Sequence, residues 1–102
     1  MVLTKAAYTK IVRSALAEIG LEFADANELK ECTIKRVLQQ LSDVGGTNWD
    51  PSPNVLAGLI VLLALEKMNY VPGFNGDWFD ENADQTVGDL IDHLHEAQIS
   101  LD

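Results

Sequence analysis

Disulfides, clustered basic side chains and membrane-length apolar runs are all missing from this sequence of 102 residues. Cys32 is the single cysteine, so no internal disulfide can form, and zinc-finger spacing is absent. No lysine or arginine follows Lys67, which argues against direct nucleic-acid binding, because phosphate backbones are bound by clustered basic side chains. The longest apolar run, residues 55–65, is shorter than the roughly 18 residues that span a bilayer, so we expect no membrane segment.

Acidic side chains are abundant instead, and they are unevenly placed. The formal net charge is -9; residues 1–36 carry six basic and five acidic side chains, whereas residues 37–102 carry one basic and eleven acidic ones. This distribution favours diffusional steering towards a partner protein with a basic surface. A solvated acidic face that keeps the protein in solution is the other interpretation.

Length and composition indicate one domain over residues 1–102 with a modest core. Apolar residues make up 47% of the chain and charged residues 23%, which is ordinary for a globular protein. No charged-then-apolar leader with a cleavage site opens the sequence, so we expect cytoplasmic residence.

The apolar run is the segment around which the remaining chain is expected to pack. Residues 55–65 contain no polar side chain, and a helix that is apolar on every face has to be surrounded by other elements. Ser52 can cap such a helix and Pro53 suits its first turn, so we predict a buried helix over residues 53–69. A buried strand is the alternative, since periodicity alone does not distinguish the two in a short run.

Three further helices are predicted from apolar spacing and end signals, over residues 4–19, 28–44 and 86–97. The first ends at Gly20, and the last opens with Thr86 and Asp89 as a capping pair. Ile99 and Leu101 are expected to extend the core contact of the last helix. Together the four helices predict an all-α protein built as a four-helix bundle.

Residues 70–85 form the longest irregular stretch, and four aromatic and four acidic residues fall within it. Because a long loop in a compact domain is more often functional than idle, we predict a partner-binding surface here, with Trp78 and Phe79 exposed. Trp49, in the loop before the buried helix, is a further candidate anchor. Packing of these aromatic rings on the core is the alternative. The predicted partner-binding residues are Trp49, Asp77, Trp78, Phe79, Asp80, Glu81 and Asp84.

Catalytic or metal chemistry finds little support in the sequence. A nucleophilic Cys32 would need a positioned base, and only the distant His93 and His95 are candidates. These histidines lie on opposite sides of the last helix, so they cannot bind one metal ion and are expected at the surface. Residues 80–84 resemble the start of a calcium loop but lack its glycine and its final glutamate. We therefore expect no catalytic residue and no metal site.

Three short motifs follow one another in the second half of the chain. The apolar run ends in Ala64-Leu65-Glu66, an acidic loop follows at residues 80–84, and Thr86-Val87-Gly88-Asp89 opens the last predicted helix. This order, over about residues 54–97, resembles an acyl carrier protein. The resemblance implies a four-helix bundle that binds its partners through an acidic surface. That family carries a 4'-phosphopantetheine arm on a serine at the start of the corresponding helix; Val55 stands at that position here, and Ser52 is the nearest hydroxyl.

Three functional hypotheses follow. The leading one is a non-enzymatic acidic interaction module, a degenerate carrier-like adaptor or inhibitor that binds a partner protein with a basic surface and needs no cofactor. The first alternative is a working carrier with 4'-phosphopantetheine on Ser52. The second is an immunity or phage-type inhibitor whose carboxylates imitate nucleic acid. An unpaired apolar patch on one of the first two helices would equally make a homodimer.

Overall fold

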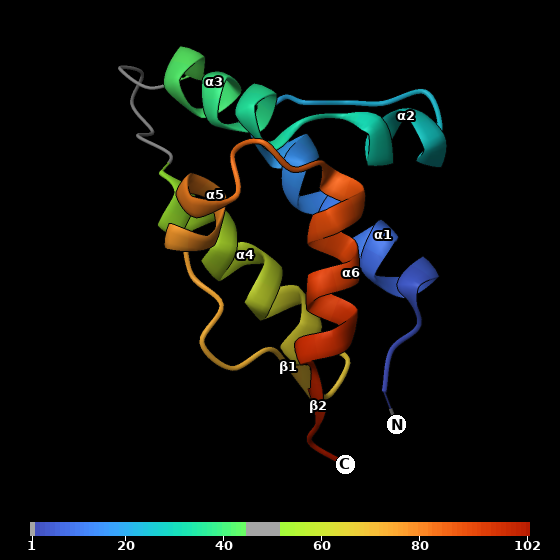
Figure 1. Cartoon of the computed structure of the whole chain (residues 1–102). Helices are drawn as coiled ribbons and strands as arrows, with labels where there is room; N and C mark the ends of the chain where they lie inside the picture. Colours follow the sequence, from blue (N-terminus) through green and yellow to red (C-terminus); the bar gives the residue numbers. More distant parts are fainter. Residues whose placement is uncertain (1, 45–51) are drawn as a thin grey trace.

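The computed structural model describes residues 2–44 and 52–102 of the chain (Figure 1). Within these ranges the protein is mostly helical, with six helices and one pair of two-residue strands. In chain order they are α1 (Lys5–Glu18), α2 (Ala26–Glu31), α3 (Ile34–Val44), α4 (Pro53–Leu65), β1 (Asn69–Tyr70), α5 (Asp77–Glu81), α6 (Val87–Ala97) and β2 (Ile99–Ser100). The all-α class is confirmed, but six described helices stand where the sequence predicted four. None of them has the length and apolar character needed to cross a membrane.

α1 lies within one residue of its predicted bounds at each end, and both ends carry helix-end signals. Thr4 Oγ1 accepts a hydrogen bond from Ala7 N at 3.2 Å and so caps the first turn. The apolar stripe of the helix is buried: Tyr8, Ile11, Val12, Ala15, Leu16 and Ile19. Gly20 follows with a φ of 83°, the left-handed conformation that glycine adopts most easily, and terminates the helix.

The predicted continuous helix over residues 28–44 is wrong, because the segment forms two helices, α2 and α3. Between them Thr33 leaves the helical conformation and forms an isolated antiparallel bridge with Thr86. The preceding Cys32 O accepts a hydrogen bond from Val87 N at 2.8 Å. The break is therefore stabilised by a segment far away in the sequence, which apolar periodicity within one helix cannot reveal.

α4 differs from its prediction in both burial and length. Its inner face is buried through Leu56, Ala57, Ile60 and Ala64. Its outer face is exposed to solvent, so the expectation that other elements surround this helix on every side is wrong. α1, α5 and β1 pack against α4, and among the described elements they leave the outer face open. The helix also ends at Leu65 rather than near residue 69, since Met68 turns the chain with a φ of 59° into β1.

The C-terminal helix α6 is confirmed, together with its capping pair. Thr86 Oγ1 accepts a hydrogen bond from Asp89 N at 3.3 Å, and Asp89 Oδ2 accepts one from Thr86 N at 3.0 Å. After α6 the chain becomes extended, and β2 pairs antiparallel with β1. Ile99 and Leu101 consequently remain exposed, so their expected contact with the core is wrong.

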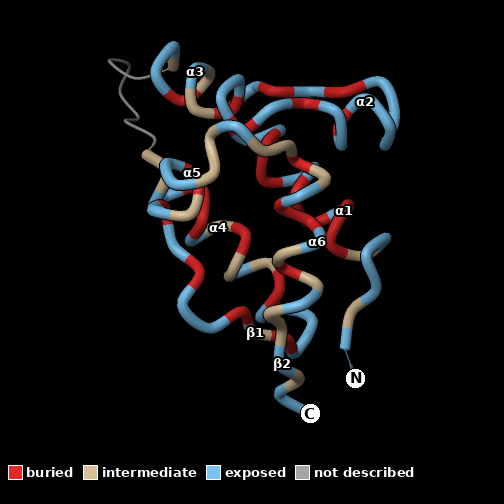
Figure 2. The backbone as a smooth tube through the Cα atoms, viewed as in Figure 1, coloured by how far each residue is buried: buried red, intermediate tan, exposed pale blue. Residues whose placement is uncertain are grey.

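The core lies where α1, α4 and α6 meet. α1 packs against both α4 and α6, and α2 packs against α6. Buried segments alternate with exposed ones along each of these helices, so that each helix turns one side inward (Figure 2). A single cluster of buried apolar residues includes members of both halves of the chain. The short helix α5 lies against the first half of α4, at the edge of this core (Figure 1).

Candidate functional site

Most of the predicted partner-binding residues form one short helix, α5 (Asp77–Glu81). Its exposed members are Asp77, Asp80 and Glu81. Trp78 is half-buried, and Asp84 lies exposed in the turn that follows the helix. Trp49 lies outside the described residues. The structure thus brings the acidic candidates together on one exposed edge of the molecule.

Phe79 is the exception in this helix, because its side chain has no exposed surface at 0%. The expected exposure of Phe79 is therefore wrong. Its ring lies edge-on to Phe74 with the two ring centroids 5.8 Å apart, a favourable arrangement for aromatic pairs. Phe79 anchors α5 to the core, and Trp78 is left as the aromatic side chain of α5 that a partner can reach.

A close approach at Gly76 fixes α5 to the start of α4. Gly76 N donates a hydrogen bond to Asn54 Oδ1 at 2.9 Å. A Cβ atom added at Gly76 would lie 2.5 Å from Asn54 N and 2.7 Å from Pro53 C, so only glycine fits here without a backbone shift. The position of the acidic helix therefore depends on the first turn of α4.

Trp78 belongs to an aromatic cluster that includes a histidine from α6. The indole stacks on the His93 ring with the centroids 5.5 Å apart and the planes 29° apart. Phe74 completes the cluster, with its centroid 6.3 Å from that of Trp78 and 6.1 Å from that of His93. His93 is half-buried rather than a plain surface residue. The stack orients the indole and connects α5 to α6.

A hollow of about 310 Å³ opens beside this cluster. It is lined by Pro72, Gly73, Phe74, Asn75, Asp77, Trp78, Glu81, His93 and Ala97. Aromatic rings and two carboxylates share this lining, and none of the lining residues is lysine or arginine. Such a set suits a cationic side chain, which is attracted by ring faces and forms charge-assisted hydrogen bonds with carboxylates. We call it the acidic hollow.

Ser52, the candidate attachment residue of the carrier hypothesis, stands at the start of α4. Its Oγ accepts a hydrogen bond from Val55 N at 3.3 Å and caps the helix. The side chain is half-buried. The hydroxyl therefore lies at a helix start, as the carrier hypothesis requires, and already has a structural role there.

Cys32 is a buried free thiol at the C-terminal end of α2. Burial raises the pKa of the Cys32 thiol, although the nearby charge of Arg36 acts in the opposite direction. A raised pKa disfavours the thiolate, which is the nucleophilic form. Within residues 2–44 and 52–102, no group of three or more histidine, cysteine, aspartate or glutamate side chains is placed to hold a metal ion.

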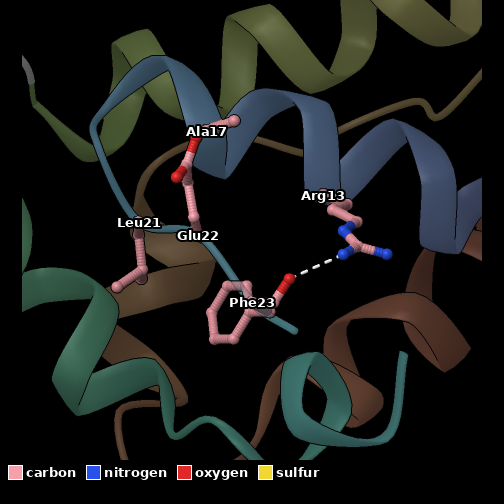
Figure 3. Close-up of a pocket in the computed structure, with 5 residues that line it drawn as sticks. All are labelled: Arg13, Ala17, Leu21, Glu22 and Phe23. Carbon is pink, nitrogen blue, oxygen red and sulfur yellow. Dashed lines mark hydrogen bonds between the residues drawn. The ribbon is translucent and has the colours of Figure 1, made fainter. Parts of the chain in front are cut away.

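Basic side chains gather elsewhere, on α1 and α2. A hollow of about 240 Å³ lies at the C-terminal half of α1. Two of its lining residues are joined by a hydrogen bond that Arg13 Nη2 donates to Phe23 O at 2.6 Å (Figure 3). A second hollow of about 280 Å³ is lined in part by Lys10, Arg13 and Lys30. We call this second one the basic hollow. The charge asymmetry of the sequence is thus carried by separate surfaces of one fold.

Phe74 and His93 line the acidic hollow, although neither was among the partner-binding residues predicted from the sequence. The aromatic content of residues 70–85 pointed towards Phe74. His93 gave no local signal, because only the packing of α5 beside α6 brings it to Trp78. No protein-family model, no curated protein and no solved structure matches this chain.

Proposed function

We propose that this protein is a non-enzymatic interaction module that binds a basic partner protein through the acidic hollow. One observation carries the proposal: the half-buried Trp78 indole and the carboxylates of Asp77 and Glu81 line the same hollow. A lysine or arginine side chain of the partner would lie against the aromatic rings and pair with the carboxylates. No lysine or arginine follows Lys67 in the chain's own sequence.

The expected strength of this contact is moderate. A cation over an aromatic ring contributes about 0.5–1 kcal/mol at an exposed site and about 2 kcal/mol when water is excluded. Each exposed ion pair adds about 0.2–1 kcal/mol. One basic side chain in the hollow therefore supplies roughly a tenfold to hundredfold gain in affinity. The surrounding carboxylates mainly increase the association rate and make it depend on salt.

A titration with a defined peptide tests the proposal. The probe is a short, otherwise neutral peptide with a central arginine, and its binding to the full chain is measured by calorimetry at low salt. We expect Trp78→Ala to weaken binding by about tenfold and Asp77→Asn by about threefold to fivefold, because each removes one of the groups that face the cation.

Asp43→Asn is the matched control, since it removes the same charge from an exposed carboxylate near the end of α3. Binding to this variant should stay within about twofold of the wild type. Equal losses for Asp77→Asn and Asp43→Asn would mean that net charge alone attracts the peptide, and the acidic hollow would lose its assigned role.

A carrier-like arrangement is the second proposal, and the position of Ser52 at the start of α4 supports it. In this version the 4'-phosphopantetheine arm would be attached through Ser52 Oγ. The acidic surface of α5 would then bind the transferase and the enzymes that act on the arm.

An immunity or phage-type inhibitor is the third version. It is supported by the exposed carboxylates that follow one another from α5 into the next turn. It differs from the first in one testable respect: nucleic acid would compete with this protein for the same basic surface of the partner.

A further inference from the structure

The outer face of α4 is apolar and regular, and none of the described segments covers it. Val55, Leu62 and Leu65 are 45%, 54% and 38% exposed, and no residue between Pro53 and Leu65 carries a charge. Together with Gly58 these residues recur at steps of three and four positions, which places them along one side of a helix. We call the four residues the outer stripe. Its spacing is that of the seam between two paired helices.

Gly58 is unexplained by the fold of a single chain. It is exposed in the middle of a helix, where glycine is less favourable than alanine. A Cβ atom added there would meet nothing within 4 Å, so packing among residues 2–44 and 52–102 does not require a glycine. A residue without a side chain at an exposed helix position allows the side chain or backbone of another helix to approach closely. The outer stripe therefore contains a gap as well as protruding side chains.

We propose that the outer stripe binds the outer stripe of a second copy of this chain, with the two α4 helices antiparallel. A two-fold axis at the level of Ile60 places Leu62 of each copy over Gly58 of the other, and Val55 opposite Leu65. The most exposed leucine of the stripe thus enters the gap left by the glycine, and the same contact forms twice, as two-fold symmetry requires. This surface is separate from the acidic hollow and does not depend on its function.

Charge favours the outer stripe over other faces as the contact between two copies. The protein carries a net charge of -9, so most contacts between two copies would bring carboxylates together. The outer stripe has no charged member. A parallel arrangement would instead place Leu62 against Leu62 and Gly58 against Gly58, so the protruding leucine would not enter the gap.

The available area indicates a weak dimer. α4 has 13 residues and is therefore about 20 Å long. One helix face of this length buries less than the roughly 800 Å² per partner that is typical of stable complexes. We accordingly expect a dissociation constant in the micromolar to millimolar range, which requires measurements on concentrated protein.

Sedimentation equilibrium of the full chain, from low micromolar to about millimolar concentration, tests the dimer. The wild type should dimerise as its concentration rises. Leu62→Glu should remove the dimer, whereas the control Val2→Glu, a charge at an equally exposed apolar residue outside the stripe, should leave it intact. A wild type that stays monomeric throughout, or equal losses in both variants, would overturn the proposal.

Gly58→Ala gives a second, independent readout. Because the added Cβ meets nothing in the chain's own fold, the dilute variant should be at least as heat-stable as the wild type. The same methyl group fills the gap that receives Leu62, so dimerisation should weaken by about tenfold. Unchanged dimerisation in this variant would contradict the predicted register.

Orientation and salt dependence separate this contact from the alternatives. In a Cys32→Ser background, a mixture of Val55→Cys and Leu65→Cys proteins should give mainly mixed disulfide dimers; an excess of like pairs would contradict the antiparallel direction.

The dimer should persist in about 0.5 M salt, because its contacts are apolar. Loss in salt would assign the association to the acidic hollow of one copy and the basic hollow of another, and would overturn the role of the stripe.

Discussion

The outer face of α4 and the acidic hollow beside α5 are both open surfaces, but they are built from opposite kinds of residue. α4 is a regular helix without charge, and its outer leucines stand in solvent. α5 lies in a stretch that is acidic and irregular in sequence, yet its Phe79 is fully buried. Apolar composition therefore did not ensure burial, and acidic composition did not ensure exposure. Which side of each element faces the core decides both cases.

The largest effect is expected from the contact that joins the two regions. Gly76→Ala places a Cβ atom within 2.5 Å of Asn54 N, so α5 has to move away from α4. We expect a loss of about 1–3 kcal/mol in the free energy of unfolding, as for other overpacked sites. In thermal unfolding, each kcal/mol corresponds to a melting temperature lower by roughly 4–8 °C.

Gly58→Ala is the matched control for that variant, because it makes the same substitution in α4 where the added atom meets nothing. It should gain about 0.5–1 kcal/mol in dilute solution, where the protein is monomeric. Similar melting temperatures for the two variants would show that the approach at Gly76 is not tight. That result would contradict the claim that this contact fixes the position of α5.

A pair of variants should separate the two surfaces functionally. Trp78→Ala is expected to lower the affinity for the arginine peptide by about tenfold and to leave self-association unchanged. Leu62→Glu is expected to abolish self-association and to leave the affinity for the arginine peptide unchanged. Both properties are measured on both proteins, by calorimetry and by sedimentation. If either variant changed both properties, the two surfaces would be coupled, which would contradict their independent roles.

Local signals in the sequence located the regular helices. Gly20 ends α1, and Thr86 with Asp89 starts α6, because each of these signals depends on the conformation or the bonds of a single turn. Such bonds need no partner from elsewhere in the chain. All-α architecture followed from these elements and from their apolar stripes.

Contacts between distant segments account for what the sequence did not reveal. The bridge between Thr33 and Thr86 divides a segment that has a continuous helical pattern. The stack of Trp78 on His93 needs α5 and α6 side by side. The outer face of α4 is open because α1 and α5 pack on its other side. The run of eleven apolar residues does not indicate which side of the helix the other elements cover.

Salt should act in opposite directions on the two surfaces. Between about 0.05 M and about 0.5 M salt, the peptide should bind the acidic hollow several-fold more weakly, because exposed charges are screened. Dimerisation through α4 should strengthen modestly, because screening reduces the repulsion between two chains that each carry -9. Calorimetry and sedimentation at the two salt concentrations provide the check. An affinity for the peptide that did not change with salt would remove charge steering from the account.

A smaller effect is expected at Cys32. Burial raises the pKa of this thiol, so the folded state favours the protonated form. This contribution to stability is present below the ordinary thiol pKa of 9.0 and is lost as the pH rises through the folded value. Alkylation by iodoacetamide at neutral pH should be slow in the folded protein and fast after unfolding. Rapid alkylation of the folded protein would reopen the case for a reactive cysteine.

If the protein is a non-enzymatic interaction module, we expect no 4'-phosphopantetheine to be attached at Ser52, at the start of α4. The protein is incubated with coenzyme A and a promiscuous phosphopantetheinyl transferase, and its intact mass is measured. The carrier version instead expects the mass of one arm to be added, and Ser52→Ala to abolish the addition. A gain that vanished in this variant would replace the module with the carrier.

The most direct measurement is a map of backbone and side-chain chemical shifts while the arginine peptide is titrated into isotope-labelled protein at low salt. We expect the largest shifts on residues that line the acidic hollow, above all the Trp78 indole NH and the His93 ring, with α4 residues 55–65 unchanged. Shifts spread evenly over all acidic segments, or none near Trp78 at saturating peptide, would contradict the assignment of the acidic hollow as the binding site.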